Sequence, residues 1–188
     1  SGVSNACLGT QAYSVPTQAG VTFTWAVSGG GTLTPSGNLA SINWTAAGSY
    51  TISVTASTPA CGNAPVQTLA VTVSAIPTTP TVTGATVACL PATEIYTVSQ
   101  VSGVNYNWTV SSGGTVNATG NTVSVLWTTV GTHPVSVTLS NQCGASQPGV
   151  LQVSVGNPSV DLGNDTSACG QVGLSLTGFS SYQWSTGA

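Results

Sequence analysis

The sequence predicts an all-β protein built of tandem, immunoglobulin-like antiparallel β-sandwiches in a row. Three observations predict this class. The chain repeats itself at a period of 82 or 83 residues, large apolar residues alternate with small or polar ones, and no segment has helical periodicity. Short strands at this spacing, in units of about 80 residues, are typical of immunoglobulin-like sandwiches.

The repeat is defined by landmark residues that keep their register through a whole unit. The matched pairs are Cys7 and Cys89, Tyr13 and Tyr96, Trp25 and Trp108, Trp44 and Trp127, Gly48 and Gly131, and Cys61 and Cys143. We therefore expect one sandwich over residues 1–75 and a second over 76–156. The proline-containing segment 76–80 joins them as a semi-rigid connection.

Residues 157–188 resemble the beginning of a third β-repeat that is incomplete. So short a segment cannot bury a sandwich core by itself. We expect the natural chain to continue beyond Ala188, and completion of this unit by another chain is the alternative.

Each strand is predicted from a period of two, in which one face of the strand is apolar. The expected strands are 21–27, 42–44, 50–55 and 69–73 in the first repeat, and 104–110, 123–125, 135–139 and 151–155 in the second. Glycine-rich turns follow the first strand of each set, at 28–31 and 111–114.

Charge is almost absent, which excludes several classes of function. The chain has no Lys or Arg, three acids (Glu94, Asp161 and Asp165) and one His. Nucleic acids and anionic membranes have no basic surface to bind, and phosphate loops and Schiff-base chemistry lack their lysine. No apolar run reaches the length of a membrane span. We expect no catalytic residues, no membrane insertion and no nucleic-acid partner.

Four of the five cysteines occupy equivalent places in the two repeats. We expect disulfides between Cys7 and Cys61 and between Cys89 and Cys143, because each pair spans 54 positions and would tie a first strand to a late turn. Cys169 matches the first cysteine of a unit, so its partner is expected outside the chain. No CxxC pair is present to suggest a zinc site.

Two further kinds of site are suggested by short polar motifs. Asp161, Asn164 and Asp165 offer oxygen ligands for Ca²⁺, with an Asx-rich turn as the alternative; no other cofactor is expected. Four sequons match the N-glycosylation pattern, at Asn43, Asn107, Asn117 and Asn164. By strand alternation, Asn43 and Asn107 should be exposed.

The aromatic residues and the single histidine are interpreted as packing residues. The phase of Trp25, Trp44, Trp108 and Trp127 matches that of the apolar strand residues, which places them in the core and not on a sugar-binding face. Tyr182 and Trp184 belong to the incomplete repeat and are left open. His133 takes the place of Tyr50 in the repeat and is expected to pack in its stead.

The chain resembles the PKD-like, immunoglobulin-related repeats of very large cell-surface proteins from Bacteroidota. The residues that carry the resemblance are 25–30 with 108–114, 48–54, and the closing Cys-Gly pairs at 61–62 and 143–144. The tail segments 161–166 and 182–188 are similar to repeats of gliding-motility-associated adhesins. The resemblance implies an extracellular location on the bacterial surface, export by the type IX system, and no catalytic residues.

The function expected from these observations is structural. We expect a disulfide-stabilised stalk or fibre segment of a large extracellular adhesin or surface filament. Its partners would be neighbouring repeats of the same chain, and unpaired sheet edges would also permit self-association into filaments. The alternative is an ancillary carbohydrate-binding module of a secreted enzyme.

Overall fold

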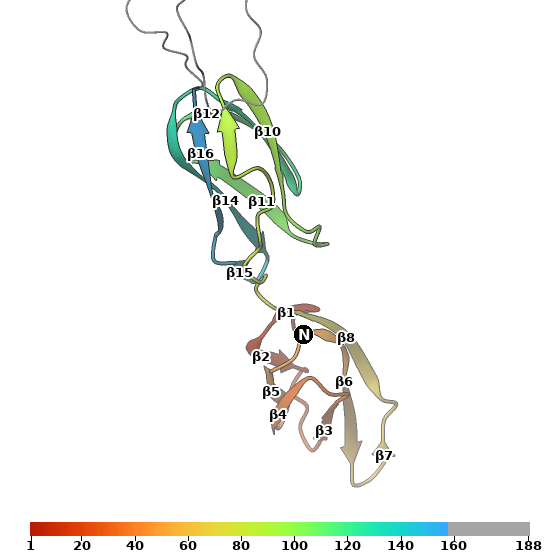
Figure 1. Ribbon diagram of the computed structural model, residues 1–188. Helices are drawn as coiled ribbons and strands as arrows, with labels where there is room; N and C mark the ends of the chain where they lie inside the picture. The colour runs from red at the N-terminus through yellow and green to blue at the C-terminus, as the bar shows by residue number, and fades with distance from the viewer. Residues whose placement is uncertain (158–188) are drawn as a thin grey trace, which may run out of the picture.

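The computed structural model describes residues 1–157, and within this range the secondary structure consists of β-strands alone. The strands form two sandwiches that lie end to end, each made of one larger and one smaller sheet (Figure 1). The predicted fold class is therefore confirmed. No helix in the described part of the chain is long and apolar enough to cross a membrane.

The first sandwich contains eight strands. Its larger sheet has the order β1-β8-β6-β3, with β7 added to β6, and its smaller sheet has the order β2-β5-β4. Their bounds are β1 Asn5–Cys7, β2 Gly9–Ser14, β3 Thr22–Val27, β4 Gly31–Ser36, β5 Leu39–Trp44, β6 Gly48–Thr58, β7 Gly62–Asn63 and β8 Gln67–Ser74. All pairs are antiparallel except β1 with β8, which are parallel.

The second sandwich repeats this topology strand for strand. Its larger sheet has the order β11-β14-β16-β9, with β15 added to β14, and its smaller sheet has the order β10-β13-β12. The bounds are β9 Val87–Cys89, β10 Ala92–Thr97, β11 Asn105–Val110, β12 Gly114–Thr119, β13 Thr122–Trp127, β14 Gly131–Asn141, β15 Gly144–Ala145 and β16 Gly149–Gly156. Here β9 and β16 form the parallel pair.

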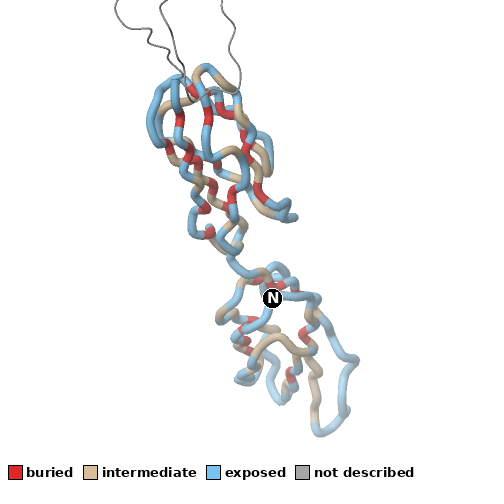
Figure 2. The backbone as a smooth tube through the Cα atoms, viewed as in Figure 1, coloured by how far each residue is buried: buried red, intermediate tan, exposed pale blue. Residues whose placement is uncertain are grey.

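The two sheets of each sandwich enclose a separate apolar core (Figure 2). The residues that fill the first core have counterparts in the second. The first core consists of Ala6, Tyr13, Trp25, Ala40, Ile42, Trp44, Ile52, Val71 and Val73. The counterparts in the second core are Ala88, Tyr96, Trp108, Val123, Val125, Trp127, Val135, Val153 and Val155. The four tryptophans are thus core residues, as predicted.

Each buried indole N–H has a partner, because an unsatisfied donor in a core costs free energy. Trp44 Nε1 donates to the Tyr13 hydroxyl at 3.2 Å, and Trp127 Nε1 donates to the Tyr96 hydroxyl at the same distance. Trp25 and Trp108 instead donate to backbone carbonyls of the turns after β4 and β12. The paired bonds hold both sandwiches to the same internal geometry.

His133 packs where Tyr50 packs in the first sandwich, as predicted. Tyr50 stacks on Trp44 with ring centroids 5.3 Å apart, and His133 stacks on Trp127 at 5.6 Å. The His133 Nε2–H donates to the Thr129 carbonyl at 3.0 Å. The histidine is therefore a structural side chain at the edge of the core.

Candidate functional site: the junction between the two domains

A disulfide joins the two sandwiches. Cys7 of β1 is bonded to Cys143, which lies in the turn between β14 and β15. The Cα atoms of the two residues are 5.5 Å apart, although 136 positions separate them in the sequence. This crosslink is the most distinctive chemical feature of residues 1–157.

The first sandwich holds Cys7 at the end of an edge strand. Cys7 is aligned with Ser74, the last residue of β8, in the parallel β1–β8 pair. The next amide, that of Leu8, donates to the Ser74 carbonyl at 3.1 Å. These contacts place the cysteine at the point where the chain leaves the first domain.

The second sandwich presents Cys143 on a tight hairpin turn. Asn141 shapes this turn, because its Oδ1 accepts a hydrogen bond from the Cys143 amide at 2.8 Å. The Asn141 Nδ2 also donates to the carbonyl of Ala75 at 2.7 Å, just after the first domain. One side chain therefore fixes the turn and binds it to the neighbouring domain.

The connecting segment packs against the same end of the second domain. Ile76 lies beside Gly144 of the hairpin, and the Pro80 carbonyl lies so close to Gly149 that an added Cβ would overlap it. The Sγ of Cys143 lies 3.5 Å from the Ser74 carbonyl oxygen. Disulfide, hydrogen bond and apolar contacts together make the junction.

The predicted disulfides Cys7–Cys61 and Cys89–Cys143 are wrong. Cys61 lies in the β6–β7 turn, at the opposite end of the first sandwich from β1 (Figure 1). A disulfide requires Cα atoms within about 7 Å, so a bond along the length of one domain is excluded by geometry. Cys89 and Cys143 are separated in the same way by the second domain. Two of the four cysteines that were expected to form these bonds, Cys61 and Cys89, are exposed free thiols.

Sequence reasoning missed the pairing for a definite reason. Repeat symmetry pairs a first-strand cysteine with a hairpin cysteine, and it is satisfied equally by a partner in the same unit or in the next unit. The spatial direction of the strands decides between them. Because β1 ends toward the second domain and the β14–β15 hairpin points back, only the pairing between neighbouring units brings the sulfur atoms together.

The remaining predicted sites fall into two groups. Asn43, Asn107 and Asn117 are exposed, so the sequons lie where a glycan has room, and their modification stays a prediction. Asp161, Asn164, Asp165, Cys169, Tyr182 and Trp184 lie outside the described residues. Within residues 1–157 no cluster of three His, Cys, Asp or Glu side chains could hold a metal ion.

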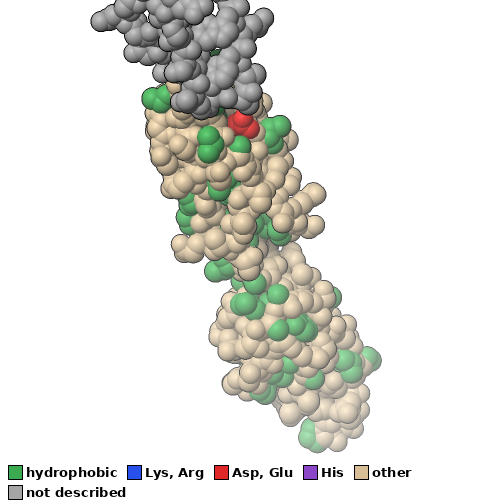
Figure 3. All heavy atoms as spheres, in the orientation of Figure 1, with side chains coloured by type: hydrophobic (Ala, Val, Ile, Leu, Met, Phe, Trp, Pro, Cys, Tyr) green, Lys and Arg blue, Asp and Glu red, His purple; other side chains and the backbone are tan. Residues whose placement is uncertain are grey.

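The surface of the described domains is nearly uncharged. The face in Figure 3 is mostly polar but neutral, with scattered apolar side chains and one acidic side chain. Glu94 is the only acid among residues 1–157. A surface of this kind gives little electrostatic attraction to charged partners.

The fold and the crosslinked junction define a class of protein, that of tandem immunoglobulin-like domains with a disulfide between them. The model of the PKD-like domain family matches residues 1–71 and again residues 75–153. The chain therefore belongs to the PKD-like domain family, whose domains are typically non-catalytic. The resemblance to PKD-like repeats is thus confirmed. No curated protein matches the chain.

Similarity to solved structures is accompanied by low sequence identity. A three-domain segment of titin, I67–I69 in an E-to-A mutated variant, is 16% identical with a TM-score of 0.51, over 82% of this chain and 62% of the titin segment. The D00-D0 domain of intimin is 16% identical with a TM-score of 0.46, over 79% of this chain and 95% of that one. The chain thus spans less than two thirds of the titin segment.

Proposed function

We propose that this chain is a load-bearing spacer in an extracellular surface protein, with its domains coupled covalently in series. The observation that carries the proposal is the disulfide between Cys7 and Cys143. It crosses the domain boundary, so it does more than stabilise one sandwich. It fixes two neighbouring units to each other.

The crosslink changes how the chain would transmit tension. A pull applied to the two ends of the chain would pass from Cys7 through the disulfide directly to Cys143. The strands between these residues, which include nearly all of both sandwiches, would carry no extension while the bond is intact. If a domain unfolded under load, a stalk of such units would lengthen only through the residues outside this loop, such as β15 and β16.

The same chemistry supports an extracellular location. Disulfides persist in oxidising compartments, and in the cytosol they are rare. The family membership supports the location as well. We infer a place in the stalk of a large bacterial surface adhesin of the gliding-motility-associated kind, on the strength of the resemblance that the sequence carries.

The described domains support the carbohydrate-binding alternative less well than the spacer role. Sugar-binding modules of that kind use exposed aromatic rings, whereas the described tryptophans are almost fully buried, from 0% exposed at Trp127 to 9% at Trp25. The spacer role is the function that the geometry favours.

Single-molecule force spectroscopy tests the proposal. The protein is stretched from its ends, first oxidised and then in reductant. Reduction is expected to release an additional contour length of about 450–490 Å, because 136 positions then become extensible at about 3.3–3.6 Å each. The Cys7→Ser variant should give the long extension without reductant. The same long extension from the oxidised wild-type protein would contradict the proposal.

A further inference from the structure

We propose that Cys61 and Cys89 are the two open ends of a disulfide ladder. Each would bond to the complementary cysteine of another PKD-like domain, in the manner of Cys7 and Cys143. Cys89 would take a hairpin cysteine, and Cys61 would take a first-strand cysteine. This inference goes beyond the spacer role, since it concerns which sulfur atoms pair and holds whether or not the protein carries load.

The backbone around Cys89 reproduces the backbone around Cys7. Cys89 is aligned with Gly156 at the end of β16, as Cys7 is aligned with Ser74 at the end of β8. The following amide of Leu90 donates to the Gly156 carbonyl at 2.8 Å, which matches the bond from Leu8. The thiol is thus set at the end of a domain in the position from which Cys7 bonds to its partner.

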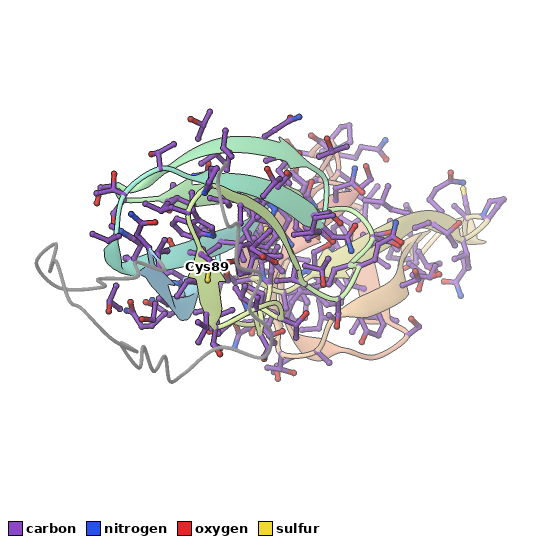
Figure 4. The ribbon with its side chains drawn as sticks, turned by 45° about the horizontal axis from the view of Figure 1, so that its top comes forward. Cys89 is labelled. Atoms are coloured by element: carbon purple, nitrogen blue, oxygen red, sulfur yellow. A yellow bond between two sulfur atoms is a disulfide. The ribbon has the colours of Figure 1, made fainter. Side chains whose placement is uncertain are left out.

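Cys89 is accessible at that end. Cys89 lies on β9 beside β16, and its side chain is exposed (Figure 4). Cys7, the equivalent residue of the first domain, is only half-buried even in its bonded state, where its sulfur contacts the hairpin of the neighbouring domain.

Cys61 stands at the repeat position of Cys143, on the corresponding hairpin of the first domain. It lies in the β6–β7 turn, and its amide donates to the Thr58 hydroxyl oxygen at 3.1 Å. In the second domain the amide of Cys143 donates to Asn141, two residues before it, whereas Thr58 lies three residues before Cys61 and Pro59 stands at the repeat position of Asn141. Both turns therefore hold their cysteine by a side-chain oxygen, with a glycine directly after it, and Cys61 is exposed at its tip.

The repetition extends to the cysteines and their turns and not to every junction contact. Gln67 occupies the place of Gly149, against which the connecting segment packs at Pro80. Because Gln67 has a side chain where Gly149 has none, a connecting segment from a preceding domain could not pack against the first domain in the way that Pro80 packs against the second. The ladder requires only that the first-strand end of one domain meets the hairpin end of another.

Each bond of the ladder is an oxidation of two thiols. Two S–H bonds break and one S–S bond forms, with two protons and two electrons passed to a disulfide oxidant. With oxidised glutathione, two molecules of reduced glutathione are produced. In each case the partner is a PKD-like domain that presents the complementary cysteine. This domain can belong to the same polypeptide or to another copy of it.

Mixing two variants tests whether the ends are complementary. Cys61→Ser and Cys89→Ser are each prepared in a Cys169→Ser background, so that one protein retains only the first-strand thiol and the other only the hairpin thiol. In a glutathione redox buffer we expect the mixed disulfide between Cys61 and Cys89 to form at least about tenfold faster than either homodimer, a preference of about 1.4 kcal/mol. Equal rates for all three products would overturn the proposal.

Peptide mapping of unreduced protein from its native source separates the two sources of the partner. Pepsin is the suitable protease, because the described chain has no Lys or Arg for trypsin and acid prevents thiol exchange. A bond from Cys89 to a hairpin cysteine of the same polypeptide indicates a ladder within one chain, and a bond to Cys61 of another copy indicates a covalent filament. Free thiols at both positions, or bonds between cysteines of the same class, would overturn the proposal. The force experiment is unaffected by either result, because it depends on Cys7 and Cys143 alone.

Discussion

At the scale of single residues, the two domains satisfy the same buried donor in the same way. Trp44 and Trp127 are almost fully buried, and each indole N–H donates to a tyrosine hydroxyl on the neighbouring strand of the same small sheet. Replacing the hydroxyl would leave a buried N–H without a partner, which costs more than the hydrogen bond itself contributes.

Tyr96→Phe should therefore destabilise the second domain by about 1–3 kcal/mol. Tyr106→Phe is a matched control, because the Tyr106 hydroxyl bonds to the exposed backbone of Val101, where water can replace it. Denaturant unfolding followed by tryptophan fluorescence measures both free energies. An equal loss in the two variants would show that the buried indole has found another partner.

Tyr96 also makes stability depend on pH. Burial raises the pKa of the Tyr96 hydroxyl, the negative charge of Glu94 raises it further, and the Trp127 hydrogen bond opposes the shift. The unfolded tyrosine ionises near pH 10 while the folded one stays neutral, so the unfolded state loses its proton first. Stability present below about pH 10 should fall as the pH rises above it.

Urea unfolding of thiol-alkylated protein above and below pH 10 measures this decline. In Tyr96→Phe the decline should be smaller, because the side chain whose pKa burial raises is then absent. A pH dependence unchanged by the substitution would assign the effect to other groups.

At the scale of elements, the start of β4 and of β12 depends on a glycine beneath an aromatic ring. Gly30 (φ +75°) lies under Tyr50, and Gly113 (φ +88°) lies under His133, so that an added Cβ would enter the ring in each case. The left-handed conformation and the lack of space act together. The glycine cluster of each turn is thus required by the packing of the edge strand that follows.

Gly113→Ala and Gly120→Ala separate these two contributions. Gly120 also has a positive φ (+56°), but nothing lies within 4 Å of its added Cβ. Gly120→Ala should cost about 1–2 kcal/mol from backbone strain. Gly113→Ala should cost about 1–3 kcal/mol more, from overpacking against His133. Thermal unfolding of both variants measures the difference, and equal values would mean that His133 moves aside freely.

The sequence predicted the strands that alternate clearly, and it missed those that do not. Segment 21–27 was recognised because Phe23 and Trp25 stand on one face, and the structure places β3 there. Strand β4 was missed because it is largely exposed and contains Pro35, which an edge strand tolerates. Strands β1 and β9, with three residues each, are too short to show a period. The cysteines were found by their repeat, but their pairing depends on strand direction, which no local pattern contains.

At the scale of the whole molecule, the junction decides whether two domains behave as one body. The proline-containing connection and the bond from Asn141 to Ala75 restrict bending, and the disulfide fixes a second point away from the connection. Two attachment points restrict the rotation of one domain relative to the other more than a single connection does. We therefore expect the disulfide to stiffen the pair in addition to limiting its extension.

Cys143→Ser should allow the two domains to move more freely relative to each other. Both cores should stay intact, because neither Cys7 nor Cys143 belongs to a hydrophobic core. We expect a broader distribution of inter-domain distances, measured by fluorescence energy transfer between labels on the two sandwiches, and an unchanged circular dichroism spectrum. Cys61→Ser is the control, since that thiol is unbonded in this chain and its loss should change neither quantity. Cys7→Ser and the double variant should match Cys143→Ser, because the two sulfur atoms act as one unit. Identical distance distributions in Cys143→Ser and wild type would show that the connection and Asn141 suffice, and that the crosslink limits extension without setting stiffness.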